Sequence, residues 1–262
     1  MKVFLVRSSL LLLLAAFPAG AFSASNSVVN LSHYDLMRPD FHRMRAEGIV
    51  GAIHEATYPP SVRDAYYAPR QEAAVRAGLL WGAYHFANAS DPIRQADHFL
   101  ATVRSAWANA DAGGRPNEVL LVLDFEKNGH YPGGTMRVDQ AVAFAERIRQ
   151  RTGQYPGLYS NENRIRSVLA GVTPAQKRVL ENCWLWIANY HKQPRHVFPW
   201  NQWTLWQYTG DGVCDLRPRR DYPISVANIR RAERNFFRGS TEGVRAFWQT
   251  HGWNPGGGTA SE

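Results

Sequence analysis

Two carboxylates one residue apart, Asp124 and Glu126, are the side chains of this chain best placed to do chemistry. They follow an aliphatic run at residues 119–123, which predicts a strand buried on both faces, as in parallel sheets. Side chains two apart on a strand share a face, so both acids should project from its C-terminal end, where α/β barrels carry active sites. Paired carboxylates in one cleft separate each other's pKa values, giving a proton donor and an ionised partner. A structural ion pair at a strand end is the competing interpretation.

Strand-like and helix-like segments alternate along the chain and would position this pair. The predicted strands cover residues 28–32, 49–53, 79–86, 119–123, 156–160, 184–188 and 203–207. The predicted helices cover residues 39–47, 69–77, 92–108 and 138–151. Residues 109–117 are expected to form a loop, and the Arg-rich segment 210–232 an irregular excursion. This alternation predicts an α/β fold with one mostly parallel domain, an irregular barrel of the TIM-like (β/α) type.

The N-terminus has the features of a secretory signal peptide over residues 1–23. Two basic residues precede an apolar run at residues 10–17, and small residues follow it. That run is too short to cross a bilayer, and no later segment has the ~20 apolar residues that a spanning helix needs. We therefore expect an exported protein, periplasmic or extracellular, with no membrane span; an uncleaved N-terminal anchor is the alternative. The catalytic domain would cover residues 24–253, and the Gly-rich tail 254–262 is predicted to be disordered.

The formal net charge of +8 favours an anionic partner. Because the chain carries an export signal, we expect that partner to be an anionic cell wall or membrane surface and not nucleic acid. A charge that serves solubility alone is the alternative.

The cysteines and histidines give no metal motif. Cys183 and Cys214 are the only cysteines, and they either pair as a disulfide in an oxidising compartment or stay free. His33 and His85 have no acidic or histidine partner at ligand spacing, which favours structural hydrogen bonds for both. No G-x-S-x-G elbow supports a serine hydrolase. We expect no cofactor and no metal.

Four segments near predicted strand ends form an ordered set that resembles a known family. They read A-G-L-L-W-G-A-Y-H-F at residues 77–86, L-D-F-E at 123–126, P-G-L-Y-S at 156–160 and W-Q-Y-T at 206–209. In this order they resemble the glycoside hydrolase family 25 muramidases, the lysozymes of the Chalaropsis type, from about residue 28 to residue 248. The resemblance implies an irregular α/β barrel that cleaves the β-1,4 bond between N-acetylmuramic acid and N-acetylglucosamine in peptidoglycan.

The resemblance makes Glu126 the acid that protonates the departing oxygen and Asp124 its partner. Asp124 either orients the acetamido group of the substrate or helps to activate water, and retention or inversion stays open. Strand-end aromatics suit sugars, although some should pack in the core, Trp184 and Phe86 above all. We expect a monomer acting on peptidoglycan glycan strands. The predicted substrate-binding residues are Asn30, Tyr84, Tyr159, Trp186, Tyr190, Trp206 and Glu233.

Several positions around the acid pair depart from the family's pattern. Asn30 stands where the family has Asp, and E-A-T-Y at residues 55–58 replaces K-A-T-E, so that Glu55 and Tyr58 differ. Glu233 stands for the Asp of a C-terminal D-x-N-x-F-x-G-S motif, for which Asp215 is a weaker candidate. The changes permit an active enzyme with an altered groove, or a weak or inactive homologue that binds glycan. Because both carboxylates are retained, we favour activity.

Overall fold

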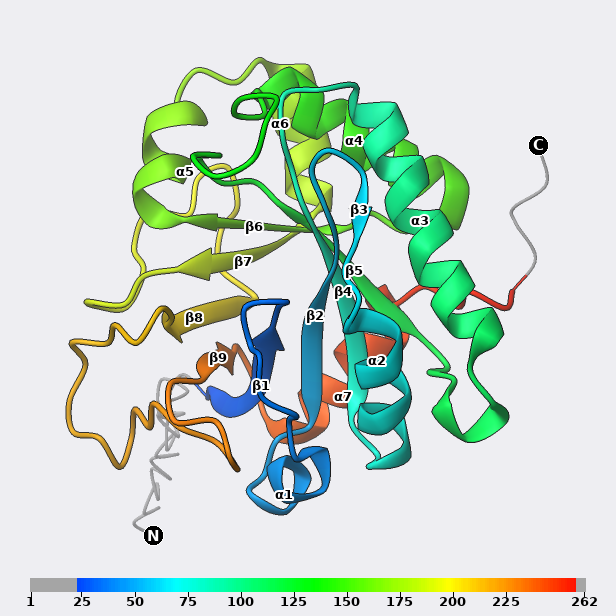
Figure 1. Ribbon diagram of the computed structural model, residues 1–262. Helices are drawn as coiled ribbons and strands as arrows, with labels where there is room; N and C mark the ends of the chain where they lie inside the picture. Colours follow the sequence, from blue (N-terminus) through cyan, green and yellow to red (C-terminus); the bar gives the residue numbers. More distant parts are fainter. Residues whose placement is uncertain (1–22, 258–262) are drawn as a thin grey trace, which may run out of the picture.

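The computed structural model describes residues 23–257, in which helices surround a closed sheet (Figure 1). The strands are β1 Ser25–Leu31, β2 Gly51–Tyr58, β3 Val62–Arg63, β4 Leu80–Phe86, β5 Val119–Asp124, β6 Gly157–Asn161, β7 Trp184–Ala188, β8 Leu205–Thr209 and β9 Glu233–Phe237. The helices are α1 Phe41–Ala46, α2 Tyr67–Arg76, α3 Pro92–Asn109, α4 Val138–Thr152, α5 Glu162–Val168, α6 Pro174–Asn182 and α7 Thr241–His251, with a 3₁₀ turn at Ala112–Gly114.

The strand order is β1-β9-β8-β7-β6-β5-β4-β2-β3, and pairing of β1 with β2 closes the barrel. The barrel strands from β1 through β2 round to β8 are parallel to their neighbours. The short β3 pairs antiparallel with β2, and β9 runs antiparallel to both β8 and β1. The start of β9 therefore lies at the same rim as the C-terminal ends of the parallel strands. This closed sheet with outer helices confirms the predicted α/β barrel.

Alternation along the strands divides the core into two layers. In β5, Leu120 and Val122 belong to the cluster inside the barrel, whereas Leu121 and Leu123 belong to the cluster under the helices. Helix α7 closes the N-terminal end of the barrel, since its Trp248 indole fills the space beside Gly51 at the start of β2. The opposite rim is left open for polar side chains.

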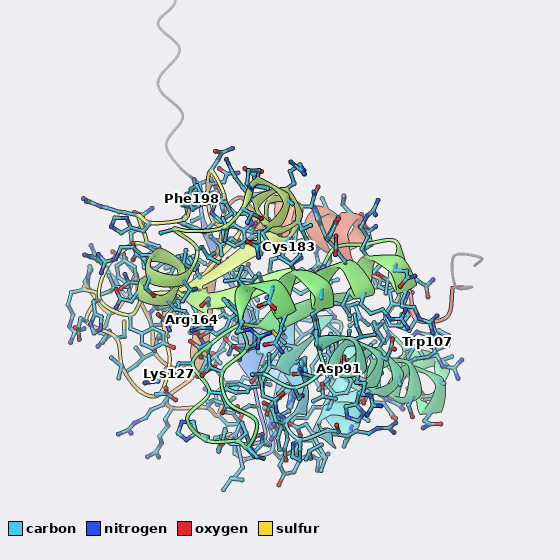
Figure 2. The ribbon with its side chains drawn as sticks, turned by 90° about the horizontal axis from the view of Figure 1, so that it is seen from above. Asp91, Trp107, Lys127, Arg164, Cys183 and Phe198 are labelled. Atoms are coloured by element: carbon cyan, nitrogen blue, oxygen red, sulfur yellow. The ribbon has the colours of Figure 1, made fainter. Side chains whose placement is uncertain are left out.

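Local sequence sets the bounds of several helices. Asp91 caps α3 by accepting from the N–H groups of the first turn, and Thr173 caps α6 in a capping box. Gly153 ends α4 with φ of 78°, a left-handed conformation that glycine adopts without strain. Helices α3 and α4 lie side by side on the outside of the barrel (Figure 2). An ion pair between Asp97 and Arg147 joins them.

Every predicted strand and helix overlaps one in the structure, and residues 210–232 form the expected irregular excursion without a helix or strand. The predictions missed β3, β9, α5, α6 and α7. Positions 1–22 of the predicted signal peptide lie outside the described residues, as do positions 258–262 of the tail. Residues 254–257 of the predicted tail form a turn in which the Asn254 side chain accepts two backbone N–H groups.

Two further expectations concern membrane crossing and the cysteines. Within the described chain, none of the helices combines the length and apolar character needed to cross a bilayer. Cys183 and Cys214 are both free and buried, so the disulfide alternative is not realised in this structure.

Candidate active site

A cavity of about 450 Å³ opens at the rim where the parallel strands end, and we call it the rim cavity. All the predicted catalytic and substrate-binding residues except Trp206 line its walls. The predicted residues that it brings together are Asn30, Tyr84, Asp124, Glu126, Tyr159, Trp186, Tyr190 and Glu233.

The end of β5 places both acids in this cavity. Asp124 is the last residue of β5, and Glu126 continues the same face two residues later. Phe125, between them, is fixed on the opposite side: its N–H donates to the Tyr159 carbonyl (2.8 Å) and its carbonyl accepts from Ser160 Oγ (2.7 Å). The Asn161 side-chain amide donates to Glu126 Oε1 (3.2 Å), which orients that carboxyl group.

Burial and mutual repulsion favour protons on the acid pair. Burial raises the pKa of Asp124 well above its ordinary value, and the charges of Glu126, Glu55 and Glu233 raise it further. Burial also raises the pKa of Glu126, while the hydrogen bond from Asn161 opposes this shift. The pair can therefore hold a proton for transfer at a pH where ordinary carboxyl groups are ionised.

Amide side chains join Asn30 and Glu233, which face each other in the β1–β9 register. Asn30 Nδ2 donates to Glu233 Oε2, and Gln207 Nε2 lies 3.1 Å from the same oxygen. Asn30 Oδ1 accepts from Asn235 Nδ2 (2.9 Å) and Gln207 Nε2 (3.2 Å). Burial raises the pKa of Glu233 to about 8, so this wall of the cavity is uncharged at neutral pH.

Three aromatic residues of the cavity are tied into the same network. The hydroxyl groups of Tyr159 and Tyr190 both donate to Gln207 Oε1, and the Trp186 indole N–H donates to Asn235 Oδ1 (2.7 Å). Sequence reasoning missed Gln207 and Asn235. Strand alternation could have found them, because each shares the inward face of a strand that carries a recognised site residue or motif.

Trp206 points away from the rim cavity, which corrects its prediction as a substrate-binding residue. Because Gln207 faces inward, its neighbour Trp206 must face outward from the barrel, where its ring packs near Tyr208 and Phe236. Its indole N–H donates to the Asn189 carbonyl (2.9 Å). The side chain is therefore part of the outer core.

The sequence also made predictions for Trp184, Phe86 and Asp215, of which the structure agrees with the first. Trp184 packs in the inner core as predicted, but Phe86, also expected in the core, is only half-buried and lines the rim cavity. Asp215 is exposed and pairs with His191 (2.6 Å), outside the rim cavity. Its position therefore does not support Asp215, in place of Glu233, as the counterpart of the Asp in the family's C-terminal motif.

The two histidines singled out by the sequence differ in their surroundings. His85 is buried and hydrogen-bonds Thr57 Oγ1 (2.8 Å) and the Gln95 side chain (3.0 Å), the structural role predicted for it. His33 instead meets acidic partners, since its Nδ1 hydrogen-bonds Glu55 Oε2 and Asp64 lies close by. The predicted hydrogen bonding of His33 is present, but sequence spacing did not reveal its acidic partners, because these contacts join separate strands.

A second cavity of about 510 Å³, which we call the side cavity, adjoins the first. Glu126, Tyr190 and Asp211 line both cavities, so Glu126 stands at their junction. Arg166 and Lys192 add cationic groups to the side cavity. Together the two cavities form an extended groove with an acid at its middle.

Comparison with known proteins agrees with this fold. The family model described as "Glycosyl hydrolases family 25" matches residues 29–215. A lysozyme structure from Streptomyces coelicolor is 25% identical with a TM-score of 0.66, covering 87% of this chain and 99% of that one. A muramidase structure from Acremonium alcalophilum, 22% identical with a TM-score of 0.63, covers 85% of this chain and 98% of that one.

Two curated relatives are similar over part of the chain. Lysozyme M1 of Streptomyces globisporus is 27% identical over 183 residues, which are 64% of this chain and 57% of that protein. An uncharacterized protein, YegX, of Escherichia coli O6:H1 is 29% identical over 176 residues, which are 66% of this chain and 58% of that protein. The chain thus spans less than two thirds of the length of these two relatives. With the family match covering most of its length, the chain belongs to the glycosyl hydrolases of family 25.

Proposed function

We propose that this protein is an exported peptidoglycan muramidase that hydrolyses the β-1,4 bond between N-acetylmuramic acid and N-acetylglucosamine. The observation that carries the proposal is the pair Asp124 and Glu126, two carboxyl groups with raised pKa values in one cavity at the barrel rim. Family membership supports the same reaction class. The signal-like N-terminus supports export to the compartment where the substrate lies.

Glu126 acts as the general acid in this proposal. Its side chain is half-buried and lines both cavities, so a glycan strand that occupied the whole groove would pass a glycosidic bond beside it. Its raised pKa keeps a proton available for the departing oxygen. Proton transfer to that oxygen allows the bond to break as positive charge develops on the sugar ring.

Asp124 is the partner that responds to that developing charge. It is more deeply buried than Glu126, and its Oδ1 has no hydrogen-bond partner within residues 23–257. An acceptor with a free lone pair suits either the acetamido N–H of the substrate or the attacking water. Ionisation of Asp124 as the sugar becomes positive would stabilise the transition state electrostatically.

The groove has the chemical character of a site for an anionic glycan. Tyr84, Tyr159 and Trp186 offer aromatic surface in the rim cavity for sugar rings. Arg166 and Lys192 in the side cavity suit the carboxylates of the muramyl group or its peptide. The net charge of +8 would add a long-range attraction to an anionic wall.

A glycan-binding protein without hydrolytic activity is the second candidate. The observation that favours it is the uncharged wall formed by Asn30 and protonated Glu233, where the family pattern has two aspartates. Loss of these charges removes one possible route to water activation.

Purified peptidoglycan incubated with wild type, Glu126→Gln and Asp124→Asn separates these functions. We expect wild type to release reducing-end muramic acid and Glu126→Gln to lose about 10²–10⁴-fold in rate, the usual contribution of a general acid. The Gln side chain keeps the acceptor for Asn161, so wall pull-down should be retained. Glu146→Gln, on the exposed face of α4, is the matched control with full activity. Pull-down without release by wild type would refute the enzyme and support the binding protein.

A further inference from the structure

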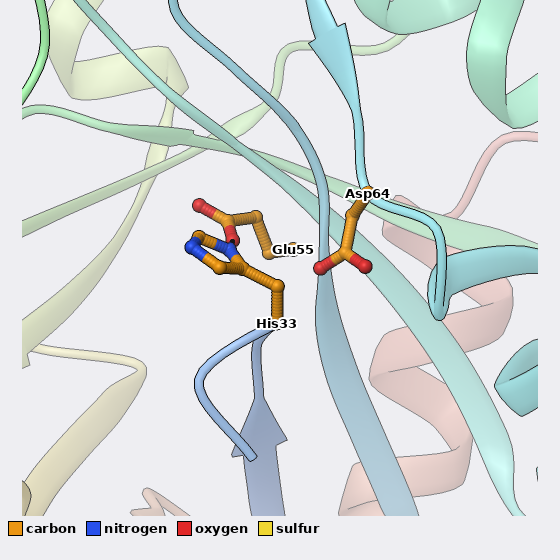
Figure 3. Close-up of side chains that lie close together, drawn as sticks. All are labelled: His33, Glu55 and Asp64. Carbon is orange, nitrogen blue, oxygen red and sulfur yellow. Dashed lines mark hydrogen bonds and ion pairs between the residues drawn. The ribbon is translucent and has the colours of Figure 1, made fainter. Parts of the chain in front are cut away.

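A histidine and two buried acids converge beside the rim cavity, on the side of β2 (Figure 3). His33 follows β1, Glu55 lies within β2, and Asp64 follows β3. One ligand-capable atom from each side chain lies within 4.8 Å of the other two. Nδ1 of His33 hydrogen-bonds Glu55 Oε2, and the Asp64 carboxylate lies close to this pair (Figure 3). These three residues, the His33 cluster, take no part in the proton transfer proposed above.

Asp64 is the member of the cluster with an unsatisfied hydrogen-bond acceptor. Its side chain is fully buried, and Oδ1 accepts from the backbone N–H of Tyr66 (2.7 Å). Oδ2 has no hydrogen-bond partner in the described part of the chain. The nearby Nδ1 of His54 is 3.8 Å away and donates instead to the Glu55 carbonyl (2.7 Å). A buried carboxylate oxygen without a partner is costly, which points to a ligand absent from the polypeptide.

The neighbouring Arg70 guanidinium does not hydrogen-bond Asp64 Oδ2. Arg70 donates to the carbonyl groups of Ser32 (2.9 Å), Asp35 and Met37 (3.0 Å), and to His54 Nε2 (3.0 Å). Its N–H groups are therefore directed at other acceptors. Two acids in a buried site carry a charge of −2 when ionised, which a divalent cation would neutralise.

The His33 ring is already held in an orientation suited to metal binding. Tyr58 stacks on it with centroids 4.5 Å apart and planes at 25°, and Tyr131 Oη lies 3.4 Å from Nε2. The second nitrogen, Nδ1, points toward Glu55. Metal-binding histidines commonly use the other ring nitrogen for an orienting hydrogen bond of this kind.

We propose that His33, Glu55 and Asp64 bind one divalent transition-metal ion, with Zn²⁺ or Mn²⁺ favoured over Mg²⁺. The imidazole nitrogen selects transition metals, because Mg²⁺ prefers oxygen ligands in octahedral geometry. Three protein ligands leave a coordination position for water. Since Glu55 also lines the rim cavity, the ion would reduce the negative charge that faces Asp124.

Isothermal titration calorimetry of the folded, chelator-treated protein tests this site with Zn²⁺, Mn²⁺ and Mg²⁺. We expect one Zn²⁺ per chain, bound at least about tenfold more tightly than Mg²⁺. Asp64→Asn should weaken Zn²⁺ binding by at least about tenfold because it removes an anionic ligand. His33→Gln provides a second variant at a partly exposed position, with the same expected loss, if the buried Asp64→Asn change impairs folding.

Asp215→Asn is the matched control, because it removes another His–carboxylate contact, the exposed pair of His191 and Asp215. This variant should leave the affinity and stoichiometry unchanged. The proposal is overturned if wild type shows no saturable Zn²⁺ binding, or if Asp64→Asn and His33→Gln fold and bind as wild type does. Loss of binding in Asp215→Asn would place the ion at the exposed pair and equally overturn it.

Discussion

Asn30→Asp tests whether the Asn30 amide lowers the free-energy cost of placing Glu233 in the wall of the rim cavity. The substitution keeps Oδ1, which accepts from Gln207 and Asn235, and replaces only Nδ2, which donates to Glu233 Oε2. The contact between an amide donor and a carboxyl acceptor becomes a contact between two carboxyl groups, while volume and the other hydrogen bonds are preserved. The free energy of unfolding should therefore report on that single contact.

The expected cost follows from burial. Asn30 is buried and Glu233 is partly buried, so solvent screens the interaction only in part. Losing a hydrogen bond and burying an additional carboxyl group should lower the free energy of unfolding by roughly 2–4 kcal/mol near pH 7. The new carboxyl group at position 30 would have a higher pKa in the folded state than in the unfolded state. The free energy of unfolding of the variant is therefore highest below the unfolded-state pKa and falls as pH rises towards the folded-state pKa. The deficit should grow with pH by at most about 1.4 kcal/mol per unit for one proton.

Urea unfolding at several pH values between about 5 and 8 measures this deficit in wild type, Asn30→Asp, Glu233→Gln and the double variant. In the double variant the amide lies at position 233 and the carboxylate at position 30, so donor and acceptor exchange places. We expect its loss of stability to be smaller than the sum of the single losses by about 1 kcal/mol or more. Strict additivity, or an Asn30→Asp variant within about 0.5 kcal/mol of wild type throughout this pH range, would refute the reasoning.

Three further predictions concern packing, titration and metal binding. Gly157→Ala should lower the free energy of unfolding by about 1–3 kcal/mol, because the new Cβ would lie 2.4 Å from the Trp184 ring. Gly171→Ala, with open space around it, should change it by less than about 0.5 kcal/mol, and equal effects in urea unfolding would contradict this. Glu233→Gln should flatten the fall in stability as pH rises from about 5 through 8, because the raised pKa of Glu233, about 8, gives stability that is lost as that group ionises; an unchanged slope would contradict it. Zn²⁺ affinity should rise with pH, because Nδ1 of His33, whose pKa Glu55 raises, must lose its proton; calorimetry showing a pH-independent affinity would contradict this.

Local patterns were enough to predict most of the barrel and its central acids. The aliphatic strand that ends at Asp124 specifies which face the next inward residue, Glu126, must occupy, without reference to any other strand. The same rule applied to β8 would have predicted Gln207, and not Trp206, as the residue that faces the site. That error came from treating a motif as a set of residue types without asking which face each member occupies.

Other features depend on contacts that no local pattern contains. Strand β9 begins with three polar residues, Glu233, Arg234 and Asn235, so neither an apolar run nor alternation marks it as part of a barrel. The His33 cluster joins residues 22 and 31 positions apart along the chain through strand pairing and the β2–β3 hairpin. Spacing rules for metal motifs look for ligands close in sequence and therefore miss this arrangement.

The departures from the family's pattern fall into two interacting groups, and this bears on whether the groove remains active. Asn30 contacts Glu233, so an amide where the family has an acid stands opposite a longer acid that its burial keeps protonated. Glu55 contacts His33 and so has a partner for the negative charge that it brings. Random decay would leave unpaired buried charges, whereas these changes match one another. Both groups surround Asp124 and alter the charge that it experiences. We therefore interpret these departures as changes that shift the pKa values of a retained acid pair, and not as signs that the pair has lost its role.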